Sequence, residues 1–169
     1  MNVRRMLVGV AAFGLLVGLT GCSGLIGGSK PRSPDASITQ SAVIDAFQLR
    51  VGDCLISAQL EGSFNEVPAV PCDEAHDSEV IKIFNLTGFP VVNATYDAKA
   101  IDAQAEEKCE QAMVDYVGPN YAEVVPELDY SWFNPTEASF AKGDREIDCV
   151  VYAYSLELDL TQSVKGLGA

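Results

Sequence analysis

Residues 97–117 read DAKAIDAQAEEKCEQAMVDYV, and this stretch decides the fold. It contains no Gly or Pro, and Gly118-Pro119 follows it as the expected stop. Apolar positions recur along it at steps of three and four residues, namely Ile101, Ala105, Cys109, Met113 and Tyr116. The spacing therefore predicts one long helix whose apolar face carries Cys109.

A strand is predicted over residues 145–154, and it supplies the partner for that face. Ile147, Cys149, Val151 and Ala153 alternate onto one side of it. Because this side is apolar, we expect it to pack against the helix. The packing would bring Cys149 next to Cys109.

Further strands are predicted by short apolar runs on either side of the helix. Residues 42–50 enter a turn at Gly52-Asp53, after which 54–56 form a strand. Residues 67–72 contain two prolines and are expected to be either an edge strand or an extended segment. Residues 79–86 are expected in the centre of the sheet, with Ile81 and Ile83 on one face and with Val80, Phe84 and Leu86 on the other. Together with 128–133, these segments predict an α+β domain, in which a mostly antiparallel sheet of four or five strands packs on one main helix.

The cysteines predict two disulfides and no metal site. Of five cysteines, Cys22 is assigned to lipid below, which leaves the even number typical of an exported chain. Four cysteines allow three pairings. We favour Cys54 with Cys72, which flank a hairpin or loop, and Cys109 with Cys149. A zinc site is disfavoured because there is no C-x-x-C pair and His76 is the sole histidine; no cofactor is expected.

The N-terminus has the layout of a secretory signal. Arg4 and Arg5 precede an uncharged apolar run over 6–19, which is shorter than the roughly 20 residues that a spanning helix needs. Leu19-Thr20-Gly21-Cys22 looks like the lipobox of bacterial lipoproteins. We therefore predict that residues 1–21 are a signal peptide and that lipid on Cys22 anchors the protein to the extracytoplasmic face of the cell membrane.

Residues 22–41 are predicted to be a flexible tether, because Gly, Ser and Pro dominate them and Lys30-Pro31-Arg32-Ser33-Pro34 cannot continue a regular element. The folded domain is predicted over 42–169. Without residues 1–21 the chain has nine basic against 24 acidic residues, a formal charge of −15. Nucleic acid is therefore excluded as a partner, since phosphate binding depends on clustered Lys and Arg.

Four groups of residues were weighed for chemistry. His76 lies in the acidic run 72–79 (CDEAHDSE) and is either a general base acting through Ser78 or water, or a loop residue that fixes a turn. The carboxylates of this run either bind calcium or form a solvated loop; the EF-hand spacing is absent. Asp144-Arg145 either offers a guanidinium to a partner's carboxylate or forms a turn with an internal ion pair. Trp132, with Tyr130 and Phe133, either lines a groove or joins the core.

A family resemblance rests on residues spread over most of the domain, 46–166: Gly52-Asp53-Cys54, Cys72, His76, Glu79-Val80, Cys109, Gly143-Asp144-Arg145, Cys149 and Ser163-Val164-Lys165-Gly166. Together these resemble the actinobacterial septum formation domain. The resemblance implies an extracytoplasmic or membrane-tethered module associated with division-septum formation, with no established catalytic mechanism. The sequence departs from the family pattern at Phe140, where a tryptophan is expected, and at Gln162, where glycine is usual.

We therefore expect a non-catalytic binding or interaction module of the cell envelope, linked to septum formation or cell-wall organisation. His76, Glu79, Asp144 and Arg145 would shape its fold or one contact surface, and the partner would be an envelope protein or a cell-wall ligand. The rival hypothesis is a small envelope hydrolase or metal-dependent enzyme centred on His76. A third hypothesis is a structural spacer or scaffold.

Overall fold

The computed structural model describes residues 32–33, 37–57, 60, 62, 65–90, 93–154 and 160–169. The predicted signal peptide, the lipidation site Cys22 and most of the predicted tether lie outside the described residues. No helix within the described ranges is long and apolar enough to cross a membrane.

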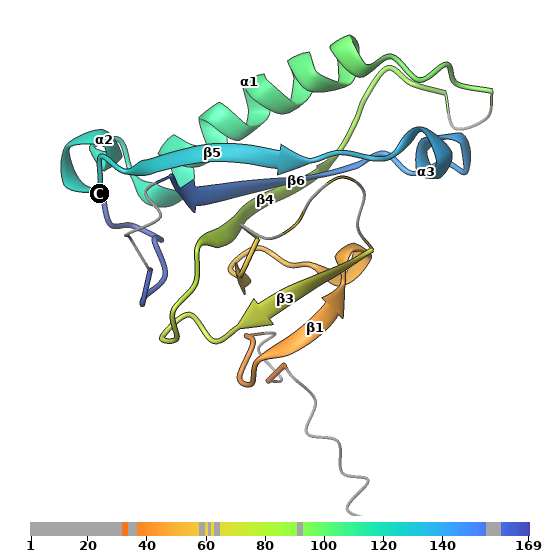
Figure 1. Ribbon diagram of the computed structural model, residues 1–169. Coiled ribbons are helices and arrows are strands. Elements are labelled where there is room, and N and C mark those ends of the chain that lie inside the picture. Colours follow the sequence, from red (N-terminus) through yellow and green to blue (C-terminus); the bar gives the residue numbers. More distant parts are fainter. Residues whose placement is uncertain are drawn as a thin grey trace, which may run out of the picture.

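The described chain forms one six-stranded antiparallel sheet with the order β1-β3-β2-β4-β6-β5. The helix α1 (Ala98–Val117) lies across one face of β4, β6 and β5 (Figure 1). The predicted α+β class is confirmed, with six strands in place of four or five. The strands are β1 Ala42–Asp45, β2 Cys54–Leu55, β3 Glu66–Val70, β4 Ser78–Asn85, β5 Leu128–Phe133 and β6 Glu146–Ala153; the short helices are η1 Ala46–Gln48, α2 Tyr121–Val124 and α3 Glu137–Ala141.

Helix α1 starts and stops where its sequence predicts. The Asp97 side chain caps the first turn by accepting a 3.1 Å hydrogen bond from the backbone N–H of Ala100. The helix ends at Gly118, whose φ of 119° favours glycine. A Cβ on Gly118 would also lie 2.3 Å from the carbonyl carbon of Gly168, so this glycine lets the C-terminal residues pack against the helix end.

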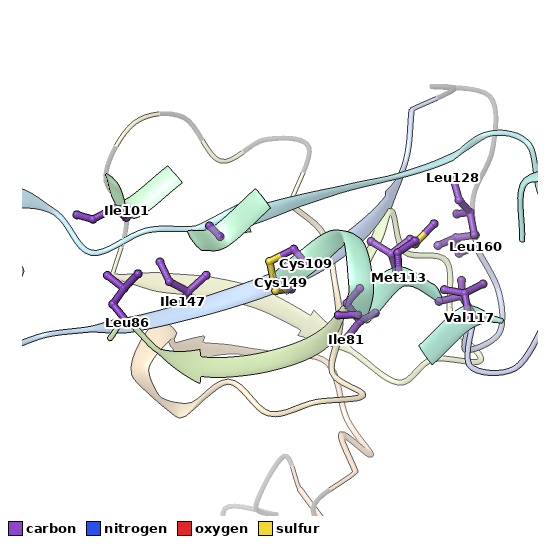
Figure 2. Packing of buried hydrophobic residues seen from close by; sticks show 14 of the residues in the cluster. Ile81, Leu86, Ile101, Cys109, Met113, Val117, Leu128, Ile147, Cys149 and Leu160 are labelled. Carbon is purple, nitrogen blue, oxygen red and sulfur yellow. A yellow bond between two sulfur atoms is a disulfide. The ribbon is translucent and has the colours of Figure 1, made fainter. Parts of the chain in front are cut away.

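The main core lies between α1 and the sheet, and the disulfide Cys109–Cys149 crosses it (Figure 2). The two Cα atoms are 5.3 Å apart, and both side chains are buried. Ile147 and Val151, two residues before and after Cys149, face the same cluster. The predicted apolar side of this strand and the predicted pairing of the two cysteines are confirmed.

Strand β4 lies inside the sheet, as predicted, but its faces differ from the prediction. A bulge between Val80 and Lys82 leaves Ile81 without a direct partner on β6. Ile81 therefore joins Phe84 and Leu86 on the α1 side, while Val80 and Ile83 contribute to the core on the other side. The expectation that Ile81 and Ile83 share a face is wrong, because one extra residue reverses the alternation.

Strand β3 lies between β1 and β2, so the predicted edge position of residues 67–72 is also wrong. The carbonyl oxygen of Pro68 accepts a 3.0 Å hydrogen bond from the Ile56 N–H, on the β2 side. The N and C=O groups of one residue in an antiparallel ladder face the same neighbour. The missing N–H of Pro68 therefore faces Ile56, just beyond the end of β2 at Leu55, so the bond that proline cannot make is the reciprocal one to the Ile56 carbonyl, where this pairing stops.

The folded domain begins before the predicted boundary at residue 42. Ile38 is buried in the second core, which lies on the face of the sheet opposite α1. Arg32 forms a 2.5 Å ion pair with the buried carboxylate of Asp53, and it forms an isolated bridge with Ile38. Arg32 and Ile38, both within the predicted tether, therefore contact the domain.

Candidate functional site

The four residues singled out in the sequence lie at opposite ends of the β4–β6 pair. Glu79 is placed opposite Val151, whereas Asn85 at the far end of β4 is opposite Glu146, next to Arg145. Six strand residues separate the two ends, which is about 20 Å at roughly 3.3 Å per residue. His76, Glu79 and Arg145 are buried. One contact surface made of all four side chains does not exist in this arrangement.

Arg145 points into the domain and holds three chain segments together. Its guanidinium donates hydrogen bonds to the carbonyl oxygens of Phe140 (2.7 Å), Pro90 (2.8 Å) and Asp144. The guanidinium carbon lies 3.6 Å from the centroid of the buried Phe140 ring. Phe140 occupies the position where the family resemblance expects tryptophan. Its ring is therefore part of the core and packs against the guanidinium of Arg145.

Asp144 shapes the turn that leads from α3 into β6. Its carboxylate accepts hydrogen bonds from the Ser139 hydroxyl (2.7 Å) and the Glu146 N–H (3.0 Å). Arg145 contacts the carbonyl of Asp144, and the bonds of the carboxylate run to these other two groups. The turn interpretation of Asp144-Arg145 is confirmed, but the turn is held by these backbone and hydroxyl contacts and not by the ion pair that was expected.

Glu79 is fully buried, and three neutral donors satisfy its carboxylate. The hydroxyls of Tyr116 (2.6 Å) and Ser163 (2.8 Å) donate to Oε1, and the Val164 N–H (2.7 Å) donates to Oε2. Burial, followed by the hydrogen bond to Glu79, raises the pKa of Tyr116 well above its usual range. Glu79 thus ties β4 to α1 and to the C-terminal segment.

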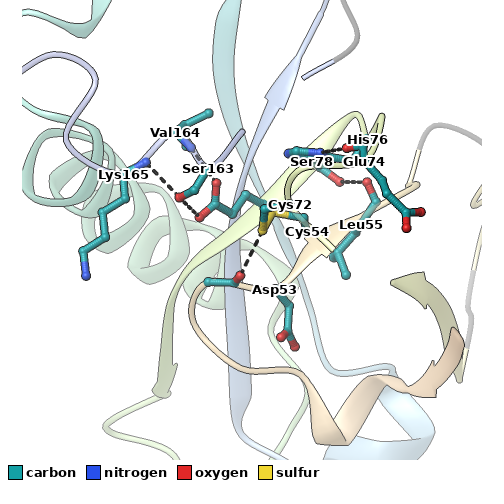
Figure 3. The surroundings of a disulfide bond; sticks show 12 residues. Asp53, Cys54, Leu55, Cys72, Glu74, His76, Ser78, Ser163, Val164 and Lys165 are labelled. Carbon is teal, nitrogen blue, oxygen red and sulfur yellow. Dashed lines mark hydrogen bonds between the residues drawn. A yellow bond between two sulfur atoms is a disulfide. The ribbon is translucent and has the colours of Figure 1, made fainter. Parts of the chain in front are cut away.

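His76 is 2% exposed and lies beside the disulfide Cys54–Cys72 (Figure 3). Its Nδ1 is 2.8 Å from the carbonyl oxygen of Glu74. A carbonyl only accepts, so Nδ1 is the donor in this contact, and in the neutral imidazole Nε2 then carries the lone pair. Nε2 is buried and has no hydrogen-bond partner within the described residues.

Three potential ligand atoms converge here. One atom each from Cys54, His76 and Glu79 lie within 4.8 Å of one another, and all three residues are buried. The Cys54 sulfur is bonded to Cys72, and the two Cα atoms are 5.2 Å apart. The predicted Cys54–Cys72 pairing is confirmed, and in this oxidised state Cys54 offers no thiolate.

A cavity of about 500 Å³ lies at the other end of the sheet, where β5 and β6 meet the turn around α3. Aromatic and acidic side chains dominate its lining, and none of its lining residues in the described part of the chain is Lys or Arg. The aromatic residues are Phe47, Tyr96, Trp132 and Phe133, and the acidic residues are Glu137, Asp144, Glu146 and Asp148.

A family model described as septum formation matches residues 39–166. This chain belongs to the septum formation family. The family resemblance read from the sequence is thereby confirmed, and it links the protein to septum formation. Comparisons with curated proteins and with solved structures found no match. The description of the septum formation family names a process and no chemical reaction.

Within the septum formation domain, Asp148 is a cavity residue whose carboxyl group is buried close to other acidic groups. It is 7% exposed, and its Oδ1 is buried without a hydrogen-bond partner in the described structure. Burial, followed by repulsion from Glu146 and Asp144, raises the pKa of Asp148 to about 7. Burial, followed by Asp144, also raises the pKa of Glu146. A bound cation would relieve this repulsion.

The sequence analysis did not single out Glu146 and Asp148 as site residues, although their alternation along the strand could be seen. They alternate with Ile147 and Cys149, so they point to the sheet face away from α1. Acids at two successive positions of one strand face usually indicate solvent, and the sequence could not show that Asp148 is covered. For Trp132 the sequence left groove and core as alternatives, whereas in the structure this residue lines the cavity and also packs against the main core.

Proposed function

We propose that this member of the septum formation family is a membrane-anchored lipoprotein of the cell envelope, and that its domain is a non-catalytic binding module. We further propose that the acidic cavity is the binding site and that it takes an organic cation carried on a peptide. The anchor rests on the signal layout and on Leu19-Thr20-Gly21-Cys22.

The single observation that carries the binding proposal is Asp148, a residue of the cavity lining whose Oδ1 is buried and has no hydrogen-bond partner among the described residues. Leaving a buried carboxylate unpaired is costly, because its charged form loses solvation. An ammonium or guanidinium group would supply both the missing donor and the opposite charge.

The aromatic lining favours an organic cation over a metal ion. Phe133 is directly opposite Asp148 in the β5–β6 ladder, and Trp132 and Tyr96 line the same cavity. Cations bind the faces of aromatic rings. A calcium ion would instead want six to eight oxygen ligands, and both carboxylate oxygens of Asp144 already accept hydrogen bonds.

The rival enzyme centred on His76 has less support. A general base must come within hydrogen-bond reach of the proton that it abstracts. The ring of His76 is enclosed, and one of its ring nitrogens lies within 4.8 Å of ligand atoms of buried Cys54 and Glu79. A spacer or scaffold without a ligand is an outcome of the test below.

The binding proposal can be tested through Trp132, the single tryptophan of the chain, which lines the cavity. Tryptophan fluorescence of the full-length chain would be titrated with peptides that carry one lysine, either free or Nε-acetylated. A second arm would use soluble cell-wall peptides with a free side-chain amine. Saturable binding that requires the free amine is expected. Whichever set binds more tightly, the lysine peptides or the cell-wall peptides, identifies the source of the ligand.

A matched pair of variants locates the site. Asp148→Asn should abolish amine-dependent binding, whereas Asp129→Asn, an equal change of charge at an exposed residue outside the cavity lining, should not. Binding that ignores acetylation, or that survives Asp148→Asn, would refute the cation site. Mass spectrometry of the native protein tests the anchor separately, because a chain that retains residues 1–21, or a bare Cys22, contradicts lipidation.

A further inference from the structure

The cluster of Cys54, His76 and Glu79 has the layout of a metal site in which a disulfide takes the place of the ion. Its three ligand atoms lie within 4.8 Å of one another. A tetrahedral zinc ion, with ligands about 2.0–2.3 Å away, holds neighbouring ligand atoms roughly 3.3–3.8 Å apart. The three atoms therefore need to approach by about an ångström.

The orientation of His76 is that of a metal ligand. Metal-binding histidines usually donate the proton of the second ring nitrogen to a carboxylate or a backbone carbonyl, which fixes the tautomer and the ring. His76 Nδ1 makes this contact with the Glu74 carbonyl oxygen. The remaining nitrogen, Nε2, is buried and unpartnered. The backbone of His76 is held as well, by two 2.9 Å hydrogen bonds exchanged with Leu160.

Glu79 is prepared in the same way. A carboxylate offers about four lone-pair sites, and Tyr116, Ser163 and Val164 use three of them. Among the described residues, Val164 is the one donor to Oε2, so one lone pair on this oxygen is left for an ion. Hydrogen bonds that hold a ligating carboxylate in place are a common feature of metal sites.

We propose that reduction of the Cys54–Cys72 disulfide converts this cluster into a zinc site whose ligands are the two thiolates, His76 Nε2 and a Glu79 oxygen. A thiol or phosphine reductant supplies two electrons, the S–S bond breaks, and each sulfur takes one proton. Zinc binding then releases these two protons, because the thiolate is the ligand. Cys72 is partly exposed and gives the reductant and the ion a way in.

The proposal is independent of the acidic cavity, which lies at the other end of the β4–β6 pair. Oxidised and reduced protein would thus differ in whether a disulfide or an ion joins β2 to the loop before β4. Either cross-link would restrain the same two segments.

The test uses the full-length chain and cobalt(II) as the spectroscopic probe for zinc. The oxidised protein should show no thiolate-to-cobalt charge transfer. After reduction with a phosphine, one cobalt per chain should bind with tetrahedral visible bands and charge transfer, and zinc should displace it. His76→Gln should weaken this binding by about tenfold or more.

Two controls keep the assignment specific. Cys54→Ser/Cys72→Ser retains Cys109 and Cys149 and should show no cobalt–thiolate band. Tyr116→Phe removes a hydrogen bond to Glu79 and should weaken metal binding about 10–100-fold, whereas Tyr96→Phe, a hydroxyl that contacts the Pro135 carbonyl, should have no effect.

Several results would overturn the zinc site. They are the absence of stoichiometric cobalt in the folded, reduced protein, and a cobalt–thiolate band that persists in His76→Gln at unchanged affinity or in the double serine variant. If reduction unfolds the chain, zinc must restore the circular dichroism spectrum and raise Tm, because binding free energy is then folding free energy. Failure to do so also counts against the site.

Discussion

The hydroxyl of Tyr116 donates a 2.6 Å hydrogen bond to Oε1 of Glu79, which joins helix α1 to the buried strand β4 across 37 residues of sequence. Ser163 and Val164 donate to the same carboxylate, so the C-terminal segment is attached to this junction. The buried carboxylate thereby accepts hydrogen bonds from neutral donors in two parts of the chain, helix α1 and the C-terminal segment.

Tyr116→Phe tests the strength of this junction. Hydrogen bonds to charged groups contribute about 1.5–3 kcal/mol, so we expect a loss of that size in the free energy of unfolding, measured with urea. Tyr96→Phe is the control, because its hydroxyl makes a 3.3 Å bond to a neutral carbonyl and should cost less, about 0.5–1.5 kcal/mol. Equal losses in the two variants would contradict a special role for Glu79.

Asp148 should make stability depend on pH. Its pKa is about 7 in the folded protein against 3.8 as its ordinary value. Between these values the unfolded chain has lost the proton that the folded chain keeps, so stability falls as pH rises from about 4 to 7 and then levels off. Asp148→Asn should remove this slope and be more stable by roughly 1–4 kcal/mol above pH 7. The free energy of unfolding would be measured with urea between pH 4 and 8. If it changes with pH equally in the original chain and in Asp148→Asn, the raised pKa does not belong to Asp148.

Protonation of Asp148 should also control the affinity of the proposed cation site. An ammonium binds the ionised form of Asp148, so affinity for a lysine peptide should rise as pH increases through about 7. The rise should level off above pH 8, and bound peptide should shift the midpoint to lower pH. Fluorescence of Trp132 measures both. If the affinity for the peptide does not change as pH rises through about 7, the amine does not bind at Asp148.

Arg145→Lys should destabilise the domain although the charge is kept. A lysine cannot reproduce the fork that reaches the Phe140 and Pro90 carbonyls together, nor stack its plane on the Phe140 ring. We expect a loss of about 2–4 kcal/mol, since buried acceptors lose their donors. Arg50→Lys, at an exposed arginine, should change thermal unfolding very little. If Arg145→Lys leaves the stability unchanged, the guanidinium does not hold these buried carbonyls together.

Two glycines with positive φ separate backbone strain from close packing. Gly88 has a φ of 82° and open space around its missing Cβ, so Gly88→Ala should cost only the strain of about 1–2 kcal/mol. Gly118→Ala should cost a further 1–3 kcal/mol, because the new methyl group meets Gly168 at 2.3 Å. Chemical denaturation of the two variants gives the difference, and equal losses would show that the C-terminal residues are not packed there.

Helix α1 and both disulfides could be predicted because their signals are local or nearly so, and the family could be recognised from motif residues spread over 46–166. The period of apolar residues over 97–117 marks the buried face of α1, and the alternation around Cys149 marks the face that meets it. Once these two faces are known, Cys109 and Cys149 have to meet. The pairing of Cys54 and Cys72 then follows from the even number of cysteines.

The positions of β3 and of the β4 side chains could not be predicted. Pro68 is tolerated inside the sheet because β2 is only two residues long, and nothing in residues 67–72 reports the length of a neighbouring strand. The bulge at Ile81 likewise depends on the pairing with β6. A bulge adds one residue without changing the composition of the strand.

By itself, the sequence determined the fold class, the long helix, the disulfide pairing and the septum formation family. Only the tertiary structure decided that His76 and Glu79 meet Cys54 in a closed cluster, that Arg145 faces inward, and that Asp148 lines an aromatic cavity with no hydrogen-bond partner for its Oδ1 in the described part of the chain. The physical reason is that periodicity tells which side chains share a face of one element. Burial, hydrogen-bond partners and pKa depend on what another part of the chain places opposite that face.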